Sequence, residues 1–217
     1  MLSVSVASPR ADYFNQHNFN QITKSLADKG WAVIDNFLPF EWSSELLEEQ
    51  QLQAKQQVFR PVGIGHENDF QVNYSKRNDK IFWLDNHQSR PAQRQYLELL
   101  ESFRQAVNLD LYLGLYELEA HAATYPPGSH YQRHLDCFQK SNRRVLTTIL
   151  YLNPRWRESD GGALRLYLEN DKPSCYLDIF PEQGRLVTFI SDQFYHEVLP
   201  TKRLRLSLTG WFLRRVL

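Results

Sequence analysis

The second half of the chain contains short apolar runs at regular intervals, and this pattern constrains the fold more than any other feature of the sequence. The runs are rich in β-branched and aromatic residues, and turn-forming Pro, Gly and Asp residues separate them. Even spacing of this kind is typical of a barrel, jelly roll or sandwich. We expect strands over residues 115–124, 130–135, 144–152, 163–168, 175–180, 185–190 and 203–213.

The first half of the chain shows helical patterns instead. Apolar residues recur at helix spacing, as in the segment that contains Ile22 and Leu26, and Gly30 follows that segment as a candidate C-terminal cap. Pro91 stands at the first turn of another such segment, where proline is favoured. We expect helices over residues 18–29, 41–57 and 91–107, and one early strand over 31–34.

A polar segment without periodicity separates these helices. Residues 58–80 mix Gly, Asn and Asp, and a polar stretch of this length is usually a functional loop or a disordered segment. The sequence therefore predicts an α+β fold that forms one structural domain. Residues 1–110 would be its helical support, with the 58–80 loop, and residues 111–217 its β-rich core.

The composition gives no sign of a nucleic-acid or membrane partner. Lys and Arg together number 25, as do Asp and Glu, so no net charge draws the chain to a polyanion. No run approaches the roughly 20 apolar residues of a membrane span, and the N-terminus lacks a signal-peptide pattern. Two cysteines are too few for a disulfide framework. We expect two thiols in a cytoplasmic protein, with one bond between them as the alternative.

A His-x-Asp pair in the β-rich half is the best candidate for a metal site. Residues i and i+2 of a strand point to the same face, so His134 and Asp136 are expected to project together. His196 follows 60 residues after Asp136, at the start of the strand pair that is expected to end the domain. Two imidazoles and one carboxylate leave coordination positions open, as in non-haem Fe(II) oxygenases. His-x-Asp alone has a plainer alternative, a surface ion pair or a hydrogen-bonded strand histidine, and His121 is interpreted as structural.

Arg205 adds an anion-binding group to this candidate site. It follows His196 by nine residues, and a buried arginine can bind a carboxylate through two parallel hydrogen bonds. Alternation puts four polar residues on one face of the last strand, Arg203, Arg205, Ser207 and Thr209. That face is either exposed to solvent or a polar interior filled by a ligand. In the first case Arg205 is an ordinary exposed strand arginine.

Several blocks of the chain resemble, in order, the prolyl 4-hydroxylase branch of the Fe(II)- and 2-oxoglutarate-dependent dioxygenases. The likeness is greatest to the prolyl hydroxylase domains of animal oxygen sensing and their bacterial relatives. The blocks are GWAVIDNFL, RNDKIFWLD, TYPPGSHYQRHLD, RRVLTTILYLN, DGGALRLY and FISDQFYHEVLPTKRLRLSLTGWF. The resemblance implies a double-stranded β-helix, a jelly-roll or cupin-like core supported by N-terminal helices.

The resemblance also implies roles for individual residues around a metal and its co-substrate. The matched positions are the iron ligands His134, Asp136 and His196, and the 2-oxoglutarate contacts Tyr125, Tyr151, Arg205 and Thr209. Tyr125 also matches a catalytic tyrosine near the iron. Arg205 matches the partner of the far carboxylate of 2-oxoglutarate. Tyr151 has plain strand core as its alternative.

On the substrate side, the resemblance implies an aromatic residue and a closing loop. Trp211 matches the aromatic position, with plain strand core as its alternative. Asp79 and Arg144 match an ion pair that ties a mobile loop to the core. The 58–80 segment would then act as a lid over a bound peptide.

The expected function is 4-hydroxylation of a prolyl residue in a protein or peptide substrate, and elongation factor Tu is the candidate target. The resemblance implies Fe(II), 2-oxoglutarate and O₂ as cofactors and co-substrates, with ascorbate as an additional reductant. Three alternatives stay open. They are an oxygenase acting on a free amino acid or other small molecule, a non-catalytic β-roll binding module, and a zinc hydrolase with the same ligands. The zinc hydrolase would leave Arg205 and Tyr151 without a role.

Overall fold

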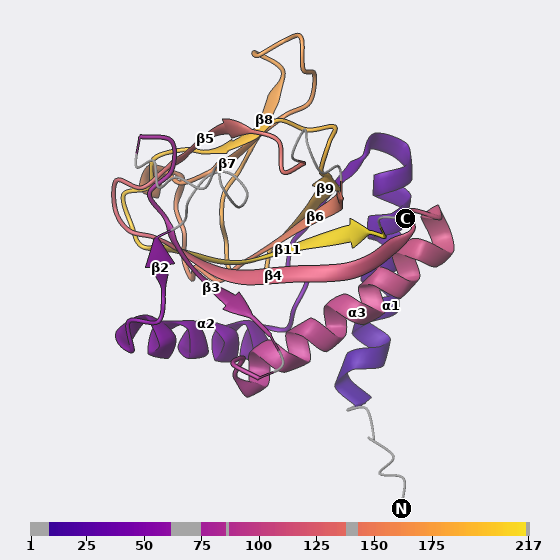
Figure 1. Ribbon diagram of the computed structural model, residues 1–217, viewed down its shortest axis with the longest axis horizontal. Helices are drawn as coiled ribbons and strands as arrows, with labels where there is room; N and C mark the ends of the chain where they lie inside the picture. The colour runs from indigo at the N-terminus through magenta and orange to yellow at the C-terminus, as the bar shows by residue number, and fades with distance from the viewer. Residues whose placement is uncertain (1–8, 62–74, 86, 138–142, 216–217) are drawn as a thin grey trace, which may run out of the picture.

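Two packed β-sheets and three helices make up the computed structural model, which describes residues 9–61, 75–85, 87–137 and 143–215 (Figure 1). The larger sheet contains, in spatial order, β1 (Trp31–Ile34), β9 (Leu186–Ile190), β6 (Arg144–Tyr151), β11 (Arg205–Arg214), β4 (Leu115–Tyr125), β3 (Lys80–Leu84) and β2 (Arg60–Pro61). The smaller sheet contains β5 (Tyr131–His134), β10 (His196–Val198), β7 (Leu164–Tyr167) and β8 (Tyr176–Ile179). Most successive strands from β4 onward alternate between the sheets, which is the double-stranded β-helix implied by the resemblance.

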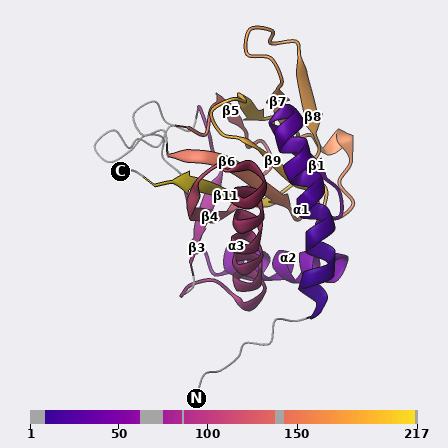
Figure 2. The same ribbon diagram turned by 90° about the vertical axis from the view of Figure 1, so that its right-hand side faces the viewer.

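Three helices cover the outer face of the larger sheet (Figure 2). They are α1 (Pro9–Lys29), α2 (Phe40–Lys55) and α3 (Pro91–Leu111). Glu49 of α2 accepts hydrogen bonds at its carboxylate from the backbone amides of Ala92 and Gln93, at 2.9 and 3.0 Å. These amides belong to the first turn of α3, where backbone N–H groups have no partner within the helix. One helix therefore caps the next.

Alternate side chains of β11 face either the hydrophobic core under the helices or the candidate site between the sheets. Leu206, Leu208 and Phe212 face the helices, and the ring of Phe212 lies 5.8 Å from that of Phe103 in α3. Arg205 and Thr209 have the opposite parity, so they face the smaller sheet, because strand side chains alternate between faces. The expected polar interior is confirmed for Arg205, Ser207 and Thr209. It is wrong for Arg203, which precedes β11 and is partly exposed on the outer surface.

The expected α+β class is confirmed, but the first half of the chain is less purely helical than expected. Strand β1 matches the predicted 31–34, whereas β2 and β3 were missed. The three-residue β10 starts at His196, where the first strand of the terminal pair was expected. The pairs β1–β9 and β3–β4 hydrogen-bond N-terminal strands to the β-rich core across the expected division at residue 110. Residues 62–74 of the expected 58–80 loop lie outside the described residues. Within the described chain, no helix combines the length and apolar character needed to cross a membrane.

Candidate active site

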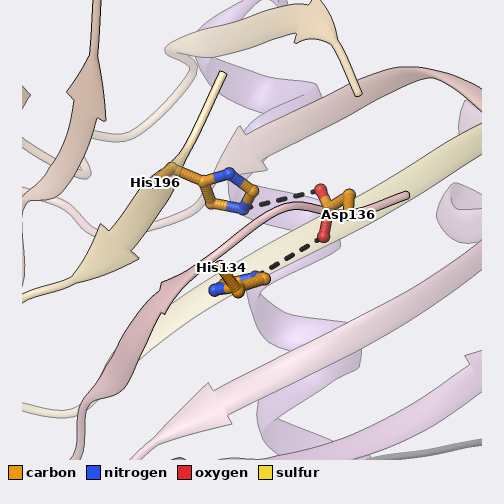
Figure 3. Close-up of side chains that lie close together, drawn as sticks. All are labelled: His134, Asp136 and His196. Carbon is orange, nitrogen blue, oxygen red and sulfur yellow. Dashed lines mark ion pairs between the residues drawn. The ribbon is translucent and has the colours of Figure 1, made fainter. Parts of the chain in front are cut away.

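Three candidate metal ligands converge between the two sheets (Figure 3). Strands β5 and β10 pair with His134 opposite His196, which brings the two imidazoles together. The Nε2 atoms of His134 and His196 lie 3.6 and 3.5 Å from the two carboxylate oxygens of Asp136. All three ligand atoms lie within 4.8 Å of one another. Asp136 was expected on the same strand as His134, but it lies two residues beyond the end of β5, in a bend.

The two histidines present their Nε2 lone pairs to this centre. The Nδ1 of His134 lies 2.7 Å from the carbonyl of Gln132, and the Nδ1 of His196 lies 3.2 Å from that of Phe194. A carbonyl only accepts hydrogen bonds, so each Nδ1 is the donor, and in the neutral imidazole this leaves the Nε2 lone pair for a metal. Burial, and next the neighbouring His134, lower the pKa of His196 to about 4. A neutral imidazole with a fixed tautomer is the form that binds a metal, so the donor set fits a divalent ion.

Neighbouring side chains hold the ligands in place. Thr147 of β6 donates to Oδ2 of Asp136 at 2.9 Å, and its hydroxyl also lies 2.9 Å from that of Ser191. This anchor accounts for the position of Asp136 beyond its strand. The ring of Tyr131 stacks on His134 with centroids 3.7 Å apart. Burial acts to raise the pKa of Asp136, but the adjacent imidazoles hold it below its usual range.

A cavity of about 560 Å³ opens from the metal ligands into the space between the sheets. Its lining includes the three candidate ligands and five other predicted site residues, Tyr125, Arg144, Arg205, Thr209 and Trp211. Tyr151 is fully buried beside Arg205 and does not line the cavity. The structure thus brings most of the predicted site to one place.

Arg205 is a buried cation in this cavity. It is 1% exposed, and its Nε donates to the carbonyl of Gly162 at 2.9 Å. Within the described chain no carboxylate forms an ion pair with it. Its guanidinium carbon lies 4.9 Å from the ring centroids of both Tyr125 and Tyr151. The hydroxyl of Tyr151 is buried without a hydrogen-bond partner among described residues, and burial raises its pKa, so it is a neutral donor. A buried guanidinium and an unpartnered hydroxyl form a site suited to a carboxylate.

The expected ion pair between Asp79 and Arg144 is wrong. Asp79 instead accepts hydrogen bonds from Nε and Nη2 of Arg77 at 2.8 and 2.7 Å. Arg144 donates to Glu119 at 3.0 Å and stacks over the ring of Trp211 at 3.6 Å. Arg77 lies two residues from Asp79 on the same segment, and this local partner satisfies both carboxylate oxygens.

His121 was interpreted as structural, but it lines the cavity. It is 4% exposed, its ring lies 4.9 Å from that of Trp211, and Trp83 packs edge-on against it at 5.4 Å. The Nδ1 of His121 and the Nε1 of Trp211 are both buried without partners in the described part of the chain. Burial, with a smaller contribution from Arg77, lowers the pKa of His121 to about 3. Its even spacing from Tyr125 along β4 was the available sequence signal.

Comparison with known proteins agrees with this geometry. Residues 120–213 match the model of the 2OG-Fe(II) oxygenase superfamily. A Pseudomonas putida prolyl 4-hydroxylase structure is 38% identical, with a TM-score of 0.81, and the match covers 91% of this chain and all of that one. A Trichoplax adhaerens prolyl hydroxylase, solved with a peptide fragment of the hypoxia-inducible factor oxygen degradation domain, is 29% identical over 92% of this chain and 90% of that one, with the same TM-score.

A longer relative covers nearly the whole chain. The hypoxia-inducible factor prolyl hydroxylase of Caenorhabditis elegans is 33% identical over 94% of this chain, but the chain spans only 29% of that protein. Proteins of this superfamily depend on Fe(II), 2-oxoglutarate and O₂. The candidate metal ligands, the buried arginine and the full-length match to the Pseudomonas enzyme agree. The chain belongs to the prolyl 4-hydroxylase family of Fe(II)- and 2-oxoglutarate-dependent dioxygenases.

Proposed function

We propose that the protein 4-hydroxylates a prolyl residue in a protein or peptide substrate, and that a proline of elongation factor Tu is a candidate target. Prolyl hydroxylase relatives with this fold support the reaction, and the Trichoplax enzyme solved with a peptide supports a peptide partner. The choice of elongation factor Tu, like a cytoplasmic location, is a prediction from the sequence.

The buried Arg205 is the observation that carries this proposal. A guanidinium that is 1% exposed and has no carboxylate partner in the described chain leaves a full positive charge in the protein interior. Burying an unpaired charge is costly, so the site is built for an anionic ligand that completes it. Arg205 and the three candidate metal ligands line the same cavity, so a dicarboxylate such as 2-oxoglutarate could bind the charge with one carboxylate and a metal with the other.

Each group of residues then has a defined task. His134, Asp136 and His196 would hold the iron, and Arg205 with the Tyr151 hydroxyl would bind the far carboxylate of 2-oxoglutarate. Bound iron, with 2-oxoglutarate and O₂, supplies the oxidising chemistry that places a hydroxyl on proline and yields succinate and CO₂. The protein positions the reactants and excludes water from them. Tyr125 and Thr209 line the same cavity.

Two tryptophans and an arginine of the cavity lining support a peptide substrate. Trp83 is 50% exposed beside the buried Trp211, and Arg144 lies over the Trp211 ring. Aromatic faces suit an apolar pyrrolidine ring, and the Arg144 guanidinium is a donor for peptide carbonyl groups. The lid function of residues 58–80 is part of this proposal.

Succinate release tests the reaction. The protein is loaded anaerobically with Fe(II), supplied with 2-oxoglutarate and then exposed to O₂. We expect O₂-dependent succinate from the unmodified protein, little from His134→Ala, and unchanged release from His87→Ala, which removes an exposed histidine. Release that does not need iron, or that survives His134→Ala, would exclude the reaction.

The substrate is tested separately by mass spectrometry. Purified elongation factor Tu is incubated with active enzyme or with His134→Ala, and its peptides are compared. We expect one additional oxygen atom on a proline only with active enzyme. Succinate release without modification of this protein would exclude it as the target while leaving the oxygenase activity intact. A hydroxylated free amino acid, formed when amino acids are supplied in place of the protein, would instead indicate a small-molecule substrate.

A further inference from the structure

The orientation of Arg205 depends on a single turn. The Nε of Arg205 donates to the carbonyl of Gly162 at 2.9 Å. This bond restricts rotation of the guanidinium and leaves its terminal amino groups for a ligand, because Nε carries only one hydrogen. The position of the Gly162 carbonyl therefore decides where the bound carboxylate must lie.

The turn itself is pressed against the segment that precedes β11. It follows the 3-10 helix η2 (Glu158–Asp160), and the amide of Gly162 donates to the carbonyl of Pro200 at 3.0 Å. Gly162 has a φ of +67°, and a Cβ there would lie 3.0 Å from Thr201 and 3.3 Å from Cδ of Arg205. Only glycine adopts this conformation in this space without strain. The acceptor and the arginine side chain are thus in direct contact.

An ion pair on the outer surface joins the same two segments. Nη1 of Arg203 lies 2.8 Å from Oδ2 of Asp160, which also accepts from the amide of Arg157 at 2.9 Å. Arg203 makes further bonds to the carbonyls of Arg155 and Pro154, at 3.2 and 3.4 Å. None of these atoms belongs to the lining of the active-site cavity.

The spacing of this ion pair is what couples it to the site. Asp160 lies two residues before Gly162, and Arg203 lies two residues before Arg205. The amide of Lys202 also donates to the carbonyl of Asp160 at 2.7 Å. Movement between the two segments therefore changes the distance between the Gly162 carbonyl and the Arg205 guanidinium.

We propose that the Asp160–Arg203 ion pair positions Arg205 from outside the cavity and thereby sets the affinity for 2-oxoglutarate. This inference rests on the proposed role of Arg205 as the carboxylate partner. Partly exposed ion pairs contribute modestly, up to about 1 kcal/mol, which corresponds to about a fivefold change in a dissociation constant. The effect falls on the Kd and KM for 2-oxoglutarate and leaves metal binding and kcat unaffected.

Two substitutions remove the ion pair by different routes. Arg203→Met keeps an unbranched side chain without charge, and Asp160→Asn keeps an acceptor for the amide of Arg157. Arg165→Met is the matched control, because it removes the bidentate Arg165–Asp178 pair on the smaller sheet, at 2.8 and 2.7 Å. That pair is similarly part-exposed and does not contact the cavity.

The test is a titration of the intact protein, loaded with redox-inactive Mn(II), with 2-oxoglutarate by calorimetry. We expect both Arg203→Met and Asp160→Asn to raise the 2-oxoglutarate Kd about fivefold and leave the Mn(II) Kd unchanged, while Arg165→Met changes neither. An unchanged 2-oxoglutarate Kd in both variants, or an equal rise in the control, would overturn the proposal.

Arg205→Met separates this proposal from the proposed function. If Arg205→Met abolishes 2-oxoglutarate binding while the ion-pair variants bind normally, the positioning role is refuted and the carboxylate site stands. If Arg205→Met binds 2-oxoglutarate normally, both are refuted. A steady-state assay adds a second readout, in which the KM for 2-oxoglutarate rises and kcat stays constant.

Discussion

His121 is expected to make the protein lose stability in mild acid. The side chain is 4% exposed and its Nδ1 has no partner among the described residues. Burial, and to a lesser degree the charge of Arg77, lower its pKa to about 3, whereas an unfolded chain has a histidine pKa of about 6.5. Arg144 acts in the same direction, and Asp79 and Asp136 oppose it. His121→Leu removes this titratable group and replaces it with an apolar side chain of similar size.

The sign and size of the effect follow from linkage. Between pH 6.5 and 3 the unfolded state binds a proton that the folded state does not, so the free energy of unfolding decreases as the pH falls. With these two pKa values, His121 alone costs about 2 kcal/mol of stability between pH 7 and pH 5. The variant should lack this part of the loss.

Urea unfolding of metal-free protein at pH 7 and pH 5 measures the difference. We expect the stability of the unmodified protein to fall by about 2 kcal/mol more than that of His121→Leu over this interval. His87→Leu, which removes an exposed histidine, should behave like the unmodified protein. Equal pH dependence in the unmodified protein and His121→Leu would show that His121 is protonated in the folded state, and would refute its burial as a neutral imidazole.

Other predictions concern the metal ligands. Thr147→Val removes the hydrogen bond to Asp136 and should weaken Fe(II) binding about 10- to 100-fold in an anaerobic titration, while Thr147→Ser should not; equal affinities would contradict the anchor. Tyr131→Leu removes the ring stacked on His134 and should also lower the affinity for Fe(II). The KM for the peptide is measured with the same variant, because a change in that KM alone would mean that Tyr131 contacts the substrate and does not support the metal ligand. Chelation should lower the melting temperature, because metal at 100 times its Kd adds about 2.7 kcal/mol to the folded state; an unchanged temperature would mean that the folded site binds no metal.

Local patterns in the sequence determined the elements of the fold and the chemical types at the site. The two-residue period of the last strand put Arg205 and Thr209 on one face, and the structure keeps them there. Strand β1 was predicted to the residue because it is bounded by the glycine that ends α1. By contrast β10 has three residues, too few for a period to be recognised.

Only the tertiary structure decided which polar face is interior and which partners meet. The same alternation was compatible with a solvent-exposed Arg205, and the packing of the smaller sheet over the larger one buried it. The resemblance matched Asp79 to Arg144 as an ion pair, but in the structure Arg77 donates to the Asp79 carboxylate. The spacing of His121 from Tyr125 could place it on the same face of β4, but its burial and its unpartnered nitrogen depend on residues distant in sequence. Burial, and the hydrogen bonds and pKa values that depend on it, arise from how the sheets stack, which no local period encodes.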